Sequence, residues 1–258
     1  MFDFTISGAR SISTMSDLQT TIPKGSKVLV TGATGHIAAH TIKLFLERGY
    51  KVRGTVRDLK SAQWLMQGSF EPFADRDDLE LVHVPDLGAK HAFDEAIKGV
   101  SAVVHIASIL SFSENPHEVI LPVVDCVRSI LETAQNEPSV KSVVYTSSIA
   151  AAVSLTPGVG AHAGPDVWND EVVEIAWSSP PHPPDYWHFV YQASKVEAEK
   201  AVWAFIRESK PNFAVNVVSP ATVLGEGLTK KHLENPYPWT KHLYDGNEEI
   251  GALFQASK

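Results

Sequence analysis

The stretch SKVLVTGATGHIAAHTIKLFLERGYKVRGTV, residues 26–56, decides the fold class of this chain. It reads as an apolar strand, a turn with two glycines, an amphipathic helix and a second strand. Val28, Leu29 and Val30 form an uninterrupted apolar run, which is typical of a parallel strand buried on both faces. The helix is expected to end at Gly49, because glycine accepts the backbone conformation that closes many helices. The stretch therefore predicts the first strand–helix–strand unit of a parallel sheet.

Strands and helices keep alternating beyond this unit. The first helix is expected to bury a face that includes Ile37, Leu44 and Leu46. The alternation predicts an α/β fold, a doubly wound parallel sheet with helices on both faces. Residues 156–187 interrupt it with six prolines and predict a long loop over the edge of the sheet. The other expected strands cover 79–84, 101–107, 141–148 and 213–220, and the other expected helices cover 91–100, 117–136 and 191–209.

Composition excludes several classes of partner. The chain of 258 residues has a formal net charge of −8 and lacks a block of Lys and Arg, so neither nucleic acid nor an anionic membrane surface is expected to bind it. No apolar run approaches the ~18 residues of a membrane-spanning helix. Cys126 is the single cysteine, which rules out an internal disulfide and fits a reducing, cytoplasmic location.

The turn between the first strand and the first helix predicts a dinucleotide site. Gly32 and Gly35 stand in the pattern T-G-x-x-G-x-x-A, with Ala38 in place of a third glycine. Glycines let a pyrophosphate approach the main chain, and the helix N-terminus offers free N–H groups and partial positive charge. The expected contacts from this turn are Thr31, Gly32, Thr34, Gly35, His36 and Ile37.

The residues after the second strand indicate which dinucleotide binds. Arg53 and Arg57 are predicted to grip a 2′-phosphate, because guanidinium groups bind phosphate in a bidentate way. Asp58 is the rival residue, since a carboxylate here favours the ribose hydroxyls of NAD. We predict NADP(H), with Arg57 as the leading contact. Further cofactor contacts are expected where the third and fourth strands end, at Asp86, Leu87, Ala107 and Ser108.

Tyr191 and Lys195 begin the predicted helix over 191–209 and share one of its faces, because four residues make slightly more than one turn. An ammonium group near a phenol is expected to lower the tyrosine pKa, which suits a general acid at neutral pH. The fifth strand ends with Ser147 and Ser148, whose side chains point to opposite sides, so only one of them is expected to face this pair.

These motifs together resemble the extended short-chain dehydrogenase/reductases, and among them the fungal and yeast NADPH-dependent aldehyde and ketone reductases, relatives of the plant dihydroflavonol and cinnamoyl reductases. The resemblance covers about residues 27–225. It rests on VTGATGHIAAH (30–40), YKVRGTVRD (50–58), VVHIASILSF (103–112), VVYTSSIAA (143–151), YQASKVEAEKAVW (191–203) and VVSPATVLG (217–225).

The resemblance implies a Rossmann fold and an NADPH-dependent carbonyl reductase, monomeric or homodimeric, acting on a small molecule. It implies that Ser148 polarises the substrate carbonyl, that Tyr191 donates the proton, and that Lys195 holds the nicotinamide ribose and tunes Tyr191. Pro220 would lie where the chain passes the nicotinamide, and His188 would neighbour the substrate. Phe112 and Trp239 are further candidates for apolar walls of the substrate pocket.

Relatives in this family continue beyond the length of this chain. We therefore expect a flexible leader at 1–24, a dinucleotide-binding domain at 25–225 and a partial C-terminal substrate lobe at 226–258. Three alternatives stay open: a sugar-nucleotide epimerase or 3β-hydroxysteroid-type dehydrogenase with the same machinery, a non-catalytic dinucleotide-binding protein, and an inactive interaction module. His36 and His40 lie four residues apart but lack an evident third ligand, so no metal is expected.

Overall fold

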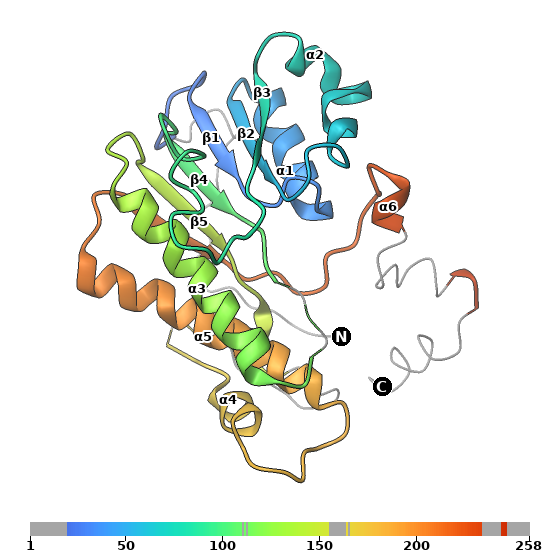
Figure 1. Cartoon of the computed structure of the whole chain (residues 1–258), viewed down its shortest axis with the longest axis vertical. Coiled ribbons are helices and arrows are strands. Elements are labelled where there is room, and N and C mark those ends of the chain that lie inside the picture. Colours follow the sequence, from blue (N-terminus) through green and yellow to red (C-terminus); the bar gives the residue numbers. More distant parts are fainter. Residues whose placement is uncertain are drawn as a thin grey trace.

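The computed structural model describes residues 20–109, 111, 113–154, 164, 166–233 and 244–246. Within these residues, six parallel strands form one sheet in the order β3-β2-β1-β4-β5-β6 (Figure 1). The strand order reverses between β1 and β4, which creates the switch point where open α/β sheets bind ligands. The predicted doubly wound parallel sheet is confirmed. The strands are β1 Lys27–Val30, β2 Lys51–Val56, β3 Leu79–His83, β4 Ala102–His105, β5 Ser142–Thr146 and β6 Ala214–Val218.

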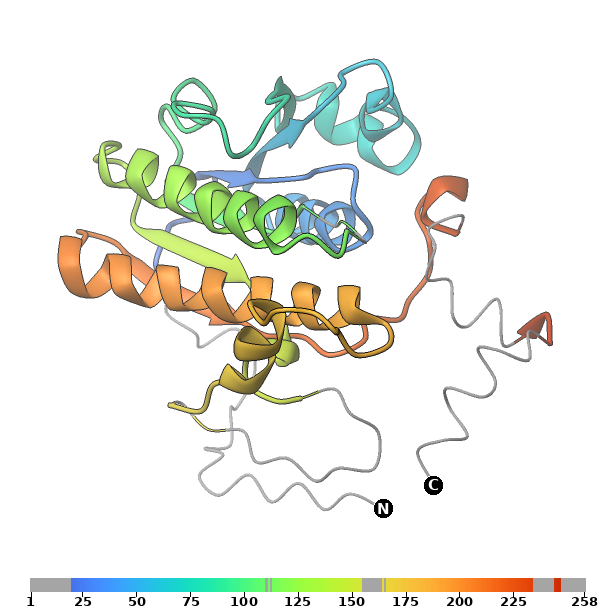
Figure 2. The same ribbon diagram turned by 60° about the horizontal axis from the view of Figure 1, so that its bottom comes forward.

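The helices cover both faces of this sheet. One core packs the sheet against α1 and the short helices that follow β2. The opposite core packs it against α3 and α5, which lie side by side (Figures 1 and 2). No helix among the described residues is long and apolar enough to cross a bilayer. The α-helices are α1 His36–Glu47, α2 Glu71–Ala74, α3 Pro116–Gln135, α4 Asp170–Ala176, α5 Tyr186–Ser209 and α6 Lys230–Leu233, and the 3₁₀ helices are η2 Gln63–Met66, η3 Gly68–Phe70 and η4 Ile149–Ala151.

Two predictions about helices are wrong. Leu44 is 48% exposed, whereas Ile42 and Leu46 of α1 are buried. Ile42 and Leu46 are one turn apart, and Leu44 lies halfway between them on the opposite side of the helix. The helix expected over 91–100 is a series of turns. His91 has a φ of 65° and Gly99 a φ of 69°, so left-handed residues bound a stretch too short to propagate a helix.

The proline-rich segment 156–187 is not a loop throughout, because its described part contains α4. Val172 and Ala176, one turn apart on α4, are buried against the start of α5. The hydroxyl of Tyr186 donates to the carbonyl of Ala176 at 2.7 Å and joins the two helices. This packing lets α5 begin at Tyr186, five residues before the predicted start.

β6 stands at one end of the sheet and pairs only with β5 among the described residues. Along β6 no residue is buried, and Val218 is 51% exposed. The apolar side chains Val223 and Leu224, which follow this strand, are exposed as well. This edge of the sheet is therefore less covered than the strands of the centre.

Candidate active site

Residues 31–35, which connect β1 to α1 and are here called the phosphate turn, pack closely on the sheet. Gly32 has a φ of 69°, and a Cβ added to it would lie 3.0 Å from Ala107 Cβ. A Cβ on Gly54 of β2 would lie 2.7 Å from Ala33 Cβ, so this strand position must be glycine for the turn to sit so close. Gly35 gives α1 no side-chain cap, which leaves first-turn N–H groups for a phosphate. The structure thus brings the predicted contacts Gly32, Gly35 and Ala107 together.

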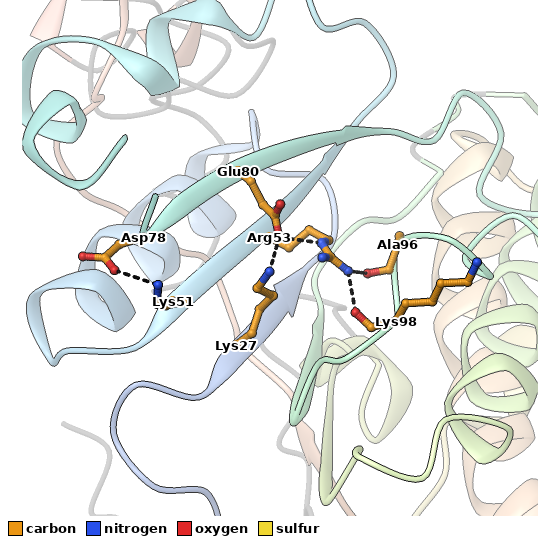
Figure 3. A network of polar contacts seen from close by, with 7 residues as sticks. All are labelled: Lys27, Lys51, Arg53, Asp78, Glu80, Ala96 and Lys98. Atoms are coloured by element: carbon orange, nitrogen blue, oxygen red, sulfur yellow. Dashed lines mark hydrogen bonds and ion pairs between the residues drawn. The ribbon is translucent and has the colours of Figure 1, made fainter. Parts of the chain in front are cut away.

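Arg53 is not part of this site, so its predicted contact with a 2′-phosphate is wrong. Its Nε donates to Glu80 Oε1 at 2.8 Å, and its Nη1 donates to the carbonyls of Ala96 and Lys98, each at 2.8 Å (Figure 3). Glu80 also pairs with Lys27, the first residue of β1, at 2.6 Å. This network joins the beginnings of three strands, at the end of the sheet opposite to the phosphate turn.

Arg57 and Asp58 follow β2 on the side of the phosphate turn. Asp58 accepts hydrogen bonds from the N–H groups of Lys60 at 2.9 Å and Ser61 at 3.3 Å. The bond from Lys60 is the main cause that lowers the Asp58 pKa. Within the described part of the chain, the guanidinium of Arg57 has no ion-pair partner, while its carbonyl contacts the His83 ring at 3.1 Å. The Asp58 carboxylate is engaged locally, and the Arg57 side chain remains available.

Ser148 and Tyr191 meet at the carboxyl end of β5. Ser148 Oγ accepts from the N–H of Ala150 at 3.2 Å and caps η4. Burial raises the pKa of Tyr191, and a hydrogen bond from Ser148 lowers it in part. The expected lowering of the Tyr191 pKa by Lys195 is therefore wrong for this structure. The Lys195 Nζ lies 5.7 Å from the centre of the Tyr191 ring and donates to Ser108 Oγ at 2.9 Å instead.

Lys195 is deeply buried for a charged side chain. It is 4% exposed, and burial lowers its pKa to about 8. A lysine with such a pKa exchanges its proton near neutral pH, unlike an ordinary lysine. Lys195 therefore loses its proton at a lower pH than an exposed lysine would.

Ser147 points away from Tyr191, as strand alternation predicts. Its Oγ donates to Glu199 Oε2 at 2.5 Å, and Glu199 Oε1 accepts from the indole N–H of Trp203 at 3.4 Å. Ser147 thus ties β5 to α5, one turn beyond Lys195. Of the two serines, only Ser148 lies beside the tyrosine.

The other predicted residues that the structure describes have fewer contacts, and only Pro220 among them is joined directly to this centre. The carbonyl of Pro220 accepts from the N–H of Ile149 at 2.9 Å, which places Pro220 next to Ser148. Asp86 Oδ1 accepts from the N–H of Gly88 at 2.9 Å. His188 is exposed, three residues before Tyr191 on α5. Phe112 and Trp239 lie outside the described residues, as do 1–19 of the predicted leader and most of the predicted lobe at 226–258.

A third histidine, which the sequence did not reveal, approaches His36 and His40. The His36 ring lies 5.0 Å from that of His40 and 5.4 Å from that of His232. The Nε2 atoms of His40 and His232 contact the carbonyls of Glu226 at 2.8 Å and Thr34 at 3.0 Å. Among the described residues, no group of three side chains is arranged to hold a metal ion. These histidines fasten the segment 225–233 to the phosphate turn.

Two buried polar residues at the site were also missed. Asn169 donates from its side chain to the carbonyl of Ala150 at 3.1 Å and from its backbone to the carbonyl of Ala151 at 3.0 Å, so it holds η4 behind Ser148. His105, at the end of β4, bonds to Thr31 at 2.9 Å. The predicted contact Thr31 has its side chain turned into the fold by this bond. The histidine of the HIAS segment was visible in the sequence, but its partner is 74 residues away.

Comparison with protein families adds to this geometry. The model of the NAD dependent epimerase/dehydratase family matches residues 28–241. The chain belongs to this family. The match includes the phosphate turn, the serine after β5 and the Tyr191–Lys195 pair, and it confirms the resemblance to the extended short-chain dehydrogenase/reductases.

Named relatives in this family include reductases. The NAD-dependent epimerase/dehydratase terH of Aspergillus terreus is 37% identical over 234 residues, covering 90% of this chain and 68% of terH. Aldehyde reductase 2 of Sporidiobolus salmonicolor is 40% identical over 205 residues, covering 79% of this chain and 59% of the reductase. The crystal structure of yeast methylglyoxal/isovaleraldehyde reductase Gre2 complexed with NADPH matches with a TM-score of 0.67 and 29% identity, covering 80% of this chain and 60% of Gre2. The matched part of the chain thus spans about 60–70% of these relatives.

Proposed function

We propose that the protein reduces an aldehyde or ketone to the alcohol with NADPH. The observation that carries the proposal is the meeting of Ser148, Tyr191 and buried Lys195 at the carboxyl ends of the strands, beside the glycine turn that packs against Ala107. The dinucleotide, when bound, supplies a hydride to the carbonyl carbon. The named reductases among the relatives support a carbonyl compound as the substrate.

The protein's own residues handle the carbonyl oxygen in this proposal. Ser148 donates a hydrogen bond to that oxygen and polarises the carbonyl. Tyr191 then gives its phenolic proton to the oxygen as the alcohol forms. Because burial raises the pKa of Tyr191, the phenol holds its proton at neutral pH and is in the acid form that the reduction requires. Lys195, whose Nζ donates to Ser108 Oγ at 2.9 Å, is proposed to hold the nicotinamide ribose.

The local contacts after β2 support NADPH over NADH. Asp58 already accepts two backbone hydrogen bonds, at 2.9 and 3.3 Å, so its carboxylate is less available to ribose hydroxyls. Arg57 lies beside it with its guanidinium unpaired among the described residues. A 2′-phosphate would give this guanidinium a charged partner, and the adenosine ribose of NADH would not.

The function is tested by mixing the protein with NADPH or NADH and following the ultraviolet absorbance of the reduced nicotinamide. The carbonyl panel contains methylglyoxal, isovaleraldehyde, α- and β-ketoesters and aryl ketones, and a separate arm contains nucleotide sugars. Consumption of NADPH with a carbonyl compound supports the reductase. Conversion of a nucleotide sugar without net consumption would support an epimerase instead. Binding of NADPH without turnover of any compound would contradict the proposed reduction.

Replacing Arg57 by glutamine is expected to raise the KM for NADPH by about 10–100-fold and to leave the KM for NADH nearly unchanged. The estimate is the roughly 1.5–3 kcal/mol of a hydrogen bond to a charged group. Steady-state kinetics with both cofactors measure the change. The control is Arg76→Gln, which removes an exposed arginine that pairs with Asp78 at 3.1 Å, near the end of the sheet opposite to the site. Equal losses with NADPH and NADH would show that Arg57 does not read the 2′-phosphate.

A further inference from the structure

A buried histidine lies between the phosphate turn and Lys195. His105 is 1% exposed, its ring stacks on Tyr145 at 5.9 Å, and it meets the ring of Phe93 edge-on at 6.2 Å. Both ring nitrogens have partners: Nδ1 lies 2.9 Å from Thr31 Oγ1, and Nε2 lies 3.5 Å from Cys126 Sγ. The proposed chemistry gives this side chain no part, although it is buried at the centre of the site.

The hydrogen bonds fix the protonation of His105. Thr31 Oγ1 accepts from the N–H groups of Ile106 at 3.1 Å and Ala107 at 3.0 Å. A hydroxyl that accepts twice has its one proton left to donate, and the nearby acceptor is Nδ1 of His105. The imidazole is therefore neutral, with its proton on Nε2 toward Cys126. Burial, and then the charge of Lys195, lower the pKa of His105 to about 3, in agreement with this assignment.

The contacts continue from Thr31 to Lys195 through the backbone. Ile106 and Ala107, which Thr31 holds, lead directly to Ser108. The Oγ of Ser108 accepts from Lys195 Nζ at 2.9 Å. Among the described residues, this is the hydrogen bond that the buried ammonium of Lys195 makes. The position of Ser108 therefore determines the position of the ammonium. Gly32 packs against Ala107, so the same backbone segment also supports the phosphate turn.

The geometry points to a positioning role for His105, and we propose that it keeps Lys195 in place. By accepting the Thr31 hydroxyl proton, the neutral imidazole orients that hydroxyl toward the two N–H groups before Ser108, and Ser108 then holds the lysine. His105 touches neither substrate nor reacting atoms in this scheme. The positioning role of His105 rests on the proposed function in one respect, which is that Lys195 takes part in the reduction.

The test follows the titration of Lys195 directly. The protein is treated with an amine-reactive acylating reagent at a series of pH values, and mass spectrometry gives the extent of labelling at Lys195. His105→Leu removes the acceptor, so the lysine should lose its fixed place, gain water, and titrate at higher pH, nearer an ordinary lysine. NADPH affinity should fall about tenfold, as for loss of one to two hydrogen bonds. His105→Asn keeps an acceptor near the position of Nδ1 and should restore both quantities in large part.

Phe93→Leu is the matched control, because Phe93 packs on the same ring without a hydrogen bond and is fully buried. It should destabilise the fold and leave the titration of Lys195 unchanged. If His105→Leu fails to fold, Thr31→Val removes the hydroxyl with little change of shape and should shift the titration in the same way. Labelling curves of His105→Leu, or of Thr31→Val in its place, that match wild type would overturn the proposal. Labelling needs no turnover, so a failure of the proposed reductase activity would be seen separately.

Discussion

Replacing Tyr191 by phenylalanine is expected to lower the rate of carbonyl reduction by about 10²–10⁴-fold, the usual contribution of a positioned general acid. The phenol is the group that Ser148 contacts at the site, and the variant keeps the ring and loses the proton. NADPH binding should stay within about twofold of wild type, since the proposed transfer needs the hydroxyl and cofactor binding depends mainly on the phosphate turn. The measurement is single-turnover oxidation of NADPH together with cofactor binding by fluorescence.

The control for this variant is Tyr50→Phe, the same chemical change at a buried tyrosine whose hydroxyl lies 3.5 Å from the carbonyl of Ile22, in the other core. It should retain wild-type turnover. A Tyr191→Phe protein that keeps more than about a tenth of the wild-type rate would assign the proton to another donor, because so small a loss is below the range of general acid catalysis.

Replacing Lys195 by methionine is expected to abolish most turnover and at the same time to stabilise the fold at neutral pH. The pKa of Lys195 is lowered to about 8 in the folded protein, so the unfolded chain holds this proton more tightly. Below about pH 8 the lysine is charged in both states, and burying its charge costs on the order of 3 kcal/mol of unfolding free energy. Methionine has a similar length without the charge, and after losses in packing we expect a gain of about 1–3 kcal/mol.

The pH dependence of the free energy of unfolding distinguishes removal of the buried charge from an improvement in packing. In wild type the free energy of unfolding should rise from about pH 8 to the ordinary lysine pKa, because over that range only the unfolded state binds the proton. The difference between Lys195→Met and wild type should shrink over the same range. Urea unfolding at several pH values measures it. The control is Lys200→Met on the same helix, since Lys200 is partly exposed and pairs with Asp170. If Lys195→Met raises the free energy of unfolding by the same amount at every pH, the buried charge is excluded as the cause.

Much of the fold follows from local pattern. The apolar runs of the strands, the glycine turn and the four-residue spacing of Tyr191 and Lys195 are all readable from neighbours in the sequence. Parallel strands place their carboxyl ends at one edge of the sheet, so the meeting of one of the two serines after β5 with Tyr191 also follows once the strands are recognised. The choice of Ser148 over Ser147 came from the family resemblance.

Most of the misses depend on contacts between distant segments, although the exposed Leu44 and the turns at 91–100 have local causes. The sequence alone suggests that Arg53 lies near the end of the second strand. Its ion pair with Glu80 on β3 shows that it lies near the beginning of β2 instead. The raised pKa of Tyr191 reflects how much chain covers it, which no spacing reveals. His105 needed the knowledge that Thr31 stands beside it. The prolines of 156–187 led to the prediction of a loop and hid the short helix α4. Its two buried residues pack against α5, a contact that the local sequence does not reveal.

The edge of the sheet at β6, which has no second partner strand among the described residues, bears on how the protein behaves at high concentration. A terminal strand that presents N–H and C=O groups outward is a template onto which another chain can add a strand. Among the described residues β6 is such a strand, and Val218 within it and Val223 and Leu224 after it are exposed. The net charge of −8 works against such encounters through long-range repulsion between copies. Salt shortens the reach of that repulsion and leaves the apolar attraction in place. We therefore expect added salt to promote association between copies of the chain, and low-salt buffers to favour separate molecules.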